Sequence, residues 1–395
     1  MKISKRIQNL EPSVTLAATA KVRELKAQGH NVIGLTVGEP DFTTPDNIEQ
    51  AAIEAIKSGA VSFYTAAGGI PELKEAIIQV TKRDYEIDVK PNQVIVTSGA
   101  KFALYALFQT ILDKGDEVII PTPYWVSYGE QVKLAEGVPV FVETVLETDY
   151  KVTVEQLNAA LTDKTQALML NSPSNPTGMI YNEKELRAIG EWAVENDVLI
   201  ISDDIYARLV YNGKHAPYMA AISDEIARQT IIINGVSKTF AMTGWRIGYA
   251  IGNAEIIKGM TDIVSQSTSN PTAVSQVASV EALLGDQSTV REMRIAFEER
   301  LNTIYPKVAA LPGVTLKKPQ GAFYLFPNVK GAMEMGGYDN VTTWVNDLLE
   351  QEHVALVTGE GFGAPENVRM SYSSSMEDLE EAVVRIRRFI ENSQK

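Results

Sequence analysis

The segment "NGVSKTFAMTGWRIGY" at 234–249 holds two cations, Lys238 and Arg246, among small and apolar residues. It follows the apolar run "TIII" at 230–233, which is typical of a buried strand. A lone lysine in a loop is most often a solvated surface residue. Lys238 therefore becomes a candidate for chemistry only if other reactive residues converge on it.

Small and polar residues also follow the other apolar runs of the chain. They are Gly99, Ala100 and Lys101; Tyr124 and Trp125; Asn175; Asp203 and Tyr206; and Ser237 with Lys238 itself. In parallel α/β sheets, ligands bind outside the carboxyl ends of the strands, so the sheet would bring these residues to one edge. Together they supply an amine, a carboxylate, an amide, a phenol, an aromatic plate and the N–H groups of a helix start.

This inventory matches the needs of pyridoxal phosphate, which requires a lysine for a Schiff base, an acid at its ring nitrogen and a phosphate site. The chain resembles the fold type I pyridoxal-phosphate aminotransferases, and the bacterial aspartate aminotransferases in particular. The resemblance covers nearly the whole chain and is carried by eight segments in order: "GEPDF" at 38–42, "YTAAGGIPELKEAI" at 64–77, "TSGAKFALY" at 97–105, "PYWVSY" at 123–128, "NSPSNPTG" at 171–178, "SDDIY" at 202–206, "SKTFAMTGWRIGY" at 237–249 and "RMSYS" at 369–373.

The resemblance implies a catalytic role for several residues. Lys238 would form the Schiff base and, once released by the substrate, move the α-proton. Asp203 would pair with the protonated ring nitrogen, with the adjacent Asp204 as its rival for that role. Tyr206 and Asn175 would donate hydrogen bonds to the phenolate oxygen of the cofactor and so keep the pKa of the imine low.

The phosphate is expected at the start of the helix that Gly99, Ala100 and Lys101 open, because helix N-termini favour anions. Ser237 can add a hydroxyl donor to this site, and Arg246 can add a guanidinium.

Residues from other segments complete the implied site. Tyr64 would reach the phosphate from a second subunit, which predicts a homodimer with shared sites. Arg369 is the expected fork for the α-carboxylate of the substrate, and the backbone N–H of Gly38 could add a contact. Trp125 would lie over the cofactor ring or flank the substrate, and Tyr124 is the alternative for stacking.

The expected specificity for the side chain of the substrate depends on two residues. Some aspartate aminotransferases bind the distal carboxylate with an arginine of the partner subunit, but the corresponding region "DIVSQSTSNPTA" at 262–273 has none. The resembling bacterial subgroup uses a lysine and a threonine instead, here Lys101 and Thr15. We therefore expect ping-pong transfer from L-aspartate to 2-oxoglutarate. An aminotransferase for aromatic amino acids, alanine or prephenate, or a C–S lyase on the same fold, is the alternative.

Composition also bears on the expected partners, metal sites and location of the protein. The formal net charge is −14, so nucleic acid is an unexpected partner. The 395 residues include no cysteine and three histidines, which disfavours a metal site. No segment has the run of apolar residues that a membrane span requires, and a cytoplasmic location is expected. "GEGFG" at 359–363 lacks the spacing of a dinucleotide-binding loop and predicts a turn.

The elements that would position these residues form two parts. Apolar runs alternate with helical patterns between 41 and 290, which predicts a large α/β domain, and the resemblance implies a mostly parallel seven-stranded sheet sandwiched by helices. We expect a long helix in "STVREMRIAFEERLNTIYPKVAAL" at 288–311 to join this domain to the rest of the chain. The remainder predicts a hairpin at 313–329, a helix at 342–352, a strand at 367–375 and an amphipathic closing helix at 376–392. We expect a smaller α+β domain from 291–395 together with 1–40.

Overall fold

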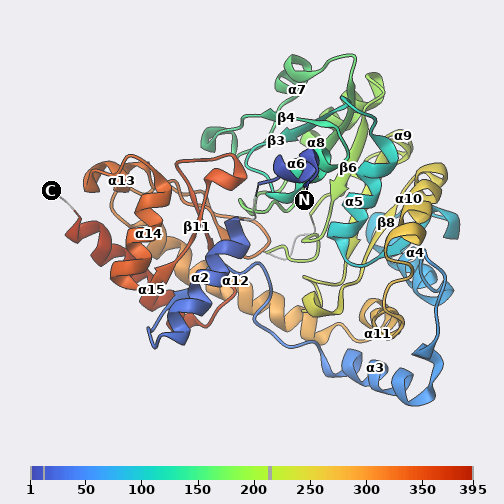
Figure 1. The fold of residues 1–395 in the computed structure, drawn as a ribbon, viewed down its shortest axis with the longest axis horizontal. Coiled ribbons are helices and arrows are strands. Elements are labelled where there is room, and N and C mark those ends of the chain that lie inside the picture. Colours follow the sequence, from blue (N-terminus) through green and yellow to red (C-terminus); the bar gives the residue numbers. More distant parts are fainter. Residues whose placement is uncertain (1, 12–13, 212–215, 394–395) are drawn as a thin grey trace.

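The computed structural model describes residues 2–11, 14–211 and 216–393, and its fold is drawn in Figure 1. Within these residues, a seven-stranded sheet has the strand order β2-β8-β7-β6-β5-β3-β4. Its strands are β2 (Val94–Thr97), β3 (Glu117–Pro121), β4 (Val138–Val142), β5 (Thr165–Asn171), β6 (Leu199–Asp203), β7 (Thr230–Gly235) and β8 (Gly248–Ile251). Neighbouring strands run parallel except for β8, which is antiparallel to both β2 and β7.

Helices cover both faces of this sheet because successive side chains of a strand point to opposite sides. In β7, Ile231 and Ile233 pack with α5 (Ala100–Ile111), α6 (Ser127–Leu134) and α10 (Ala254–Ser267). The side chain of Ile232 points the other way and packs with α4 (Pro71–Tyr85) and α11 (Ala273–Leu284). The helix α3 (Asp46–Ser58) packs with α4 and α11 in the same core. On that second face, α7 (Val154–Ala160), α8 (Glu183–Glu195) and α9 (Asp224–Arg228) cover β5 and β6. The predicted α/β class, with a mostly parallel sheet between helices, is confirmed.

A second group of elements lies on the other side of the molecule, at the left in Figure 1. Among the described residues, its strands form two small sheets: β1 (Ile33–Gly34) pairs with β10 (Val354–Ala355), and β12 (Val368–Ser371) lies between β11 (Val357–Thr358) and β9 (Tyr324–Leu325). Its helices are α2 (Val14–Ala27), α13 (Lys330–Gly336), α14 (Val341–Glu352) and α15 (Met376–Asn392). The short α1 (Lys5–Gln8) lies near α6 instead, where the Glu11 N–H donates to the Glu130 carboxylate. The hairpin expected at 313–329 is only partly regular, since Thr315 bridges Asn328 and β9 has two residues.

One long helix, α12 (Ser288–Ala309), joins the two groups, as the sequence predicts. Near its start, Val290 packs into the core between α4, α11 and the sheet. Further along, Phe297 and Leu301 pack with Trp344 and Phe389 of the second group. The helix therefore fixes the second group of elements relative to the large sheet.

The described residues contain neither a candidate membrane span nor a candidate metal site. No helix among them is long and apolar enough to cross a bilayer. In the same part of the chain, no three histidine, cysteine or acidic side chains gather in an arrangement that could hold a metal ion.

Candidate active site

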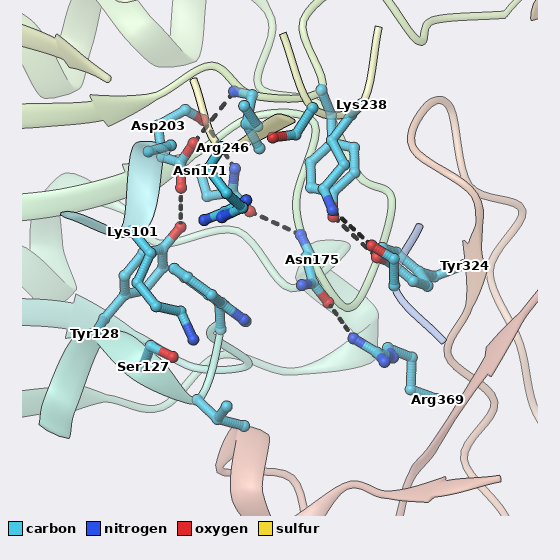
Figure 2. Close-up of a pocket in the computed structure, with 17 residues that line it drawn as sticks. Lys101, Ser127, Tyr128, Asn171, Asn175, Asp203, Lys238, Arg246, Tyr324 and Arg369 are labelled. Carbon is cyan, nitrogen blue, oxygen red and sulfur yellow. Dashed lines mark hydrogen bonds between the residues drawn. The ribbon is translucent and has the colours of Figure 1, made fainter. Parts of the chain in front are cut away.

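A cavity of about 280 Å³ lies at the carboxyl ends of β5, β6 and β7, and Figure 2 shows its side chains. Many of the residues selected from the sequence line it: Gly38, Ala100, Lys101, Trp125, Asn175, Asp203, Tyr206, Ser237, Lys238, Arg246 and Arg369. These residues come from segments up to 331 positions apart, from Gly38 to Arg369. The fold therefore brings the predicted inventory to one place.

Asp203 is the last residue of β6, and it is 4% exposed. The Tyr128 hydroxyl donates to its Oδ2 at 2.6 Å, and the Ile205 N–H donates to its Oδ1 at 3.1 Å. Burial raises the pKa of Asp203 to about 6, although these two hydrogen bonds and the charge of Lys238 act in the opposite direction. The neighbouring Asp204 points away from the cavity and accepts hydrogen bonds from Tyr85 and Ser202. Of the two acids, Asp203 is thus the one that faces the cavity.

Lys238 follows β7, and its side chain is partly buried. Its Nζ donates to the Gly38 carbonyl oxygen at 2.6 Å. Burial lowers the pKa of Lys238 to about 8, and the charges of Arg246 and Arg369 lower it further, against Glu39 and Asp203. An amine with such a pKa is a nucleophile and a base near neutral pH.

The start of α5 and the Arg246 guanidinium form one wall of the cavity. Gly99 precedes the helix with φ +89°, a backbone conformation that glycine adopts readily and other residues rarely do. A Cβ at Gly99 would lie 2.3 Å from Arg246 Nη2, so only glycine leaves room for this approach. Arg246 is held by the Thr243 carbonyl oxygen at 2.9 Å, and Ser237 lines the same cavity. Helix N–H groups, a hydroxyl and a guanidinium together make a site for a phosphate-sized anion.

Arg369 of β12 is 1% exposed, yet its guanidinium reaches the cavity. Nη1 donates to Asn175 Oδ1 at 3.0 Å, and Nη2 donates to the Thr36 carbonyl oxygen at 2.8 Å. Its planar group lies 4.5 Å from the ring centre of Tyr324. Among the described residues, Arg369 Nε has no hydrogen-bond partner. A buried donor in this state indicates a missing acceptor.

A short chain of hydrogen bonds connects three sides of the cavity. Asn171 Nδ2 donates to the Asp203 carbonyl oxygen at 2.8 Å. The Asn175 N–H donates to Asn171 Oδ1 at 2.7 Å, and the Asn175 side chain accepts from Arg369. Figure 2 shows Asn175 between Asp203 and Arg369. The position of each group is therefore fixed relative to the others.

Of the two aromatic residues considered for stacking, Trp125 lines the cavity. Tyr124 borders a separate small void and stacks on Phe141, with ring centres 4.7 Å apart. Lys101 Nζ lies 4.9 Å from the ring centre of Trp125, at the edge of the cavity. Burial lowers the pKa of Lys101, and the charge of Arg246 lowers it further.

Four residues selected from the sequence are not among those that line the cavity: Gly99 and Tyr124, described above, and Tyr64 and Thr15. Tyr64 is 93% exposed, which leaves the predicted contact from a second subunit a prediction. Thr15 belongs to α2, but its side chain lies outside the described part of the structure.

Several lining residues were not selected from the sequence, namely Val126, Ser127, Tyr128, Asn171, Ile205 and Tyr324. Tyr128 and Asn171 lie in the "PYWVSY" and "NSPSNPTG" segments, so those segments carried a signal for them. Tyr324 lies in none of the eight segments, and only its place in the cavity beside Arg369 and Tyr206 reveals it.

The cavity has the opposite charge balance to the chain. Its described lining carries four cationic side chains, Lys101, Lys238, Arg246 and Arg369, and one carboxylate, Asp203. The chain as a whole has a formal net charge of −14. Such a reversal in a concave site favours a ligand with several negative charges.

Comparisons with known proteins agree with this geometry. The family model for aminotransferase class I and II matches residues 30–386. An asparagine–oxo-acid transaminase of Streptococcus mutans is 58% identical over 390 residues, with 99% of both chains covered. An aspartate aminotransferase of Bacillus subtilis is 56% identical over 391 residues, again with 99% of both chains covered. The solved structure of an aspartate aminotransferase from Thermus thermophilus with maleate superposes with a TM-score of 0.93, at 41% identity, over 98% of this chain and 100% of that one. The chain therefore belongs to the aminotransferase class I and II family, which confirms the resemblance read from its sequence.

Proposed function

We propose that this aminotransferase uses pyridoxal phosphate to transfer the amino group of L-aspartate to 2-oxoglutarate. One observation carries the proposal: the cavity combines an amine of lowered pKa, Lys238, with a buried carboxylate, Asp203, and with three further cationic side chains. Such a combination suits a phosphorylated aldehyde together with a dicarboxylic amino acid.

The residues fit the cofactor. Lys238 would hold it covalently through Nζ, and Asp203 would face its ring nitrogen. Arg246, Ser237 and the N–H groups at the start of α5 would hold the phosphate, in the space that Gly99 leaves open. Trp125 and Tyr206 line the same cavity, one as a flat face and the other as a hydroxyl donor. Bound there, pyridoxal phosphate would supply an electron sink that makes the Cα–H of the amino acid acidic.

Lys238 is the base in this proposal. Its Nζ would take the proton from Cα of the substrate, hold it as an ammonium, and later donate it back on the same side of the site. The lowered pKa, about 8, keeps a useful fraction of the amine neutral near physiological pH. The hydrogen bond to the Gly38 carbonyl oxygen gives the ammonium form a resting position within the cavity.

Asp203 and its hydrogen-bond donors would hold a negative charge next to the ring nitrogen. The hydrogen bonds from Tyr128 and Ile205 favour the ionised carboxylate against burial. A cation at the ring nitrogen would lower the pKa of Asp203 from its raised value of about 6. The carboxylate would thus remain charged in the loaded enzyme.

Substrate binding would use the remaining cations. Arg369 would bind the α-carboxylate, since its Nε has no partner among the described residues and its plane is fixed by Tyr324. Lys101, at the opposite edge beside Trp125, would bind the distal carboxylate. Thr15 remains the second predicted contact for that group. Fixing both ends of the substrate orients its Cα–H bond toward Lys238.

The relatives support a dicarboxylic substrate. The names of the Bacillus subtilis and Thermus thermophilus relatives specify aspartate, and the latter structure contains maleate, a dicarboxylate. Asparagine is the second candidate, because the Streptococcus mutans relative is named for it. Lys101 favours aspartate over asparagine, since an ammonium gains more from a carboxylate than from a neutral amide.

A half-reaction tests this proposal. Cofactor-loaded protein mixed with L-aspartate and no 2-oxo acid acceptor should release one oxaloacetate per active site and then stop. The same measurement with asparagine, alanine and phenylalanine at equal concentration should give slower release of their 2-oxo acids. Faster reaction with asparagine would make this an asparagine transaminase, and faster reaction with phenylalanine would refute the dicarboxylate specificity.

Assembly into a homodimer is part of the proposal. Tyr64 and the adjacent Phe63 are 93% and 77% exposed, which is unusual for aromatic side chains. A second copy that receives Tyr64 at its phosphate site would cover both rings. Sedimentation analysis should then give twice the mass of the chain, and Tyr64→Phe should weaken cofactor binding without dissociating the dimer.

The two-domain division also remains a proposal. Residues 41–290 would form the cofactor-binding domain, and residues 1–40 with 291–395 would form the smaller domain that closes over the substrate. The pairing of β1 with β10 supports the joining of the two terminal segments. A cytoplasmic location is likewise still a prediction from the sequence.

A further inference from the structure

Two tyrosine hydroxyls meet inside the cavity. The Tyr206 and Tyr324 oxygens lie 2.8 Å apart, and either could be the donor. Both side chains are buried, and their rings meet edge to face with centres 5.9 Å apart. Tyr206 was selected from the sequence as a cofactor ligand, whereas Tyr324 was not.

The hydrogen bond between the two tyrosines leaves one of their hydroxyl protons without an acceptor among the described residues. The pair carries two hydroxyl protons, and the hydrogen bond between them uses one. Within the described residues, neither hydroxyl has another hydrogen-bond partner. The second proton is therefore available to a group in the cavity, and its direction depends on which tyrosine donates.

Arg369 decides that direction. Its guanidinium carbon lies 4.5 Å from the ring centre of Tyr324, so a fixed positive charge faces that ring. Burial raises the pKa of Tyr324 and raises that of Tyr206 well above its ordinary value. The charge of Arg369 opposes both rises, but it is the largest opposing influence on Tyr324, whereas for Tyr206 it is smaller than the interactions with Tyr324 that raise the pKa. The hydroxyl beside the cation is the more acidic one and hence the better donor. Tyr324 thus donates to Tyr206, and the Tyr206 proton is left for the cavity.

We propose that Tyr324 is a positioning residue that aims the Tyr206 proton at the phenolate oxygen of the bound cofactor. The inference rests on the proposed function, because it requires pyridoxal phosphate in the cavity. Without the Tyr324 hydroxyl, Tyr206 can turn its proton away, and the hydrogen bond to the cofactor is only partly populated. Tyr324 also links this proton to Arg369, the proposed carboxylate-binding residue.

The test uses the spectroscopic pKa of the loaded protein, which is the pH at which the visible absorbance of the bound cofactor changes. Tyr324→Phe removes the hydroxyl but keeps the ring against Arg369, so it should raise this pKa by about 0.5 unit. Tyr206→Phe should raise it by about 1 unit, since the donor itself is lost. The KM for aspartate should stay near the wild-type value in Tyr324→Phe.

Tyr372→Phe is the matched control. Tyr372 is another buried tyrosine, and its hydroxyl donates to the Ala322 carbonyl oxygen at 3.1 Å, but it is not among the residues that line the cavity. Its variant should leave the spectroscopic pKa unchanged. A shift equal to that of Tyr324→Phe would mean that any buried hydroxyl lost nearby has this effect, which would overturn the inference.

The double variant gives the decisive result. In the Tyr206→Phe background, Tyr324→Phe should cause no further shift, because no proton remains to be aimed. An equal shift in both backgrounds, or no shift in the wild-type background, would overturn the inference and leave the proposed function intact. Wild-type protein that acquires no cofactor absorbance would overturn the proposed function and this inference with it.

Discussion

Replacement of Arg369 by lysine keeps a positive charge in the cavity but removes the guanidinium fork. In the wild-type protein, two guanidinium nitrogens are held by Asn175 Oδ1 at 3.0 Å and the Thr36 carbonyl oxygen at 2.8 Å. The group lies over the rings of Tyr324 and Phe362, 4.5 and 5.2 Å from their centres. A lysine ammonium cannot keep these contacts and bind a carboxylate through two parallel hydrogen bonds.

The size of the effect follows from the lost contacts. Each hydrogen bond to a charged group contributes about 1.5–3 kcal/mol, and at least one such bond to the substrate is lost. A loss of about 2–3 kcal/mol corresponds to a 30- to 150-fold decrease in kcat/KM, with about tenfold for each 1.4 kcal/mol. The decrease should be similar for aspartate, glutamate and alanine, because all three carry the α-carboxylate.

Steady-state kinetics with each amino acid and a fixed 2-oxo acid measure this decrease. Arg300→Lys is the matched control, since Arg300 also lies over two rings, Phe42 and Phe297, and binds Asp41 through two nitrogens at 2.6 and 2.9 Å. It does not line the cavity, and its variant should keep kcat/KM within about twofold while lowering thermal stability. A wild-type kcat/KM in Arg369→Lys, or a loss restricted to aspartate and glutamate, would refute the α-carboxylate assignment.

Three further changes test other parts of the site. Gly99→Ala should weaken cofactor binding by at least about tenfold, because the added Cβ would meet Arg246. Gly115→Ala is the control, since Gly115 also has a positive φ, +95°, but open space where its Cβ would lie, so this variant should only lower stability. Equal effects of the two variants on cofactor affinity would contradict the crowding argument. Lys101→Ser should reduce kcat/KM about tenfold for aspartate and much less for alanine, and an equal loss on both would show that Lys101 serves the phosphate instead. In cofactor-free protein, Lys238→Met should increase the free energy of unfolding below about pH 8, because the wild-type protein must bury an ammonium there. This gain should vanish above about pH 10.5, where the amine is neutral in both the folded and the unfolded protein. Thermal unfolding across this pH range measures the difference, and a gain that grows with pH would contradict the lowered pKa.

Continuous apolar runs in the sequence mark β2, β3, β5, β6 and β7, whereas no such run marks β4 or β8, whose reasons are tertiary. β4 lies at the edge of the large sheet with most of its residues partly or fully exposed, so its segment "VPVFV" carries a weaker pattern. β8 has four residues and begins at Gly248, where a Cβ would lie 2.1 Å from the Ala100 nitrogen. That glycine is required by the start of another helix, which no local pattern reveals.

The site shows the same limit. Residues at strand ends, such as Asp203 and Lys238, were predictable because a parallel sheet gathers its carboxyl ends at one edge. The choice between Asp203 and Asp204 depends on the direction in which each side chain points at the end of β6. From the sequence, only the resemblance to the family, in which the first acid of the pair has this role, favours Asp203. Tyr324 comes from the small sheet 86 positions after Lys238, so its approach is fixed by packing between the two groups of elements.

The most direct test of the account is the location of the covalent bond to the cofactor. Borohydride reduction of the loaded protein, followed by proteolysis and mass spectrometry, should find one pyridoxyl group per chain, on the peptide that contains Lys238. Lys238→Ala should bind the cofactor without a covalent label. A label on Lys101 or any other lysine, or a wild-type protein that cannot be labelled, would contradict the account.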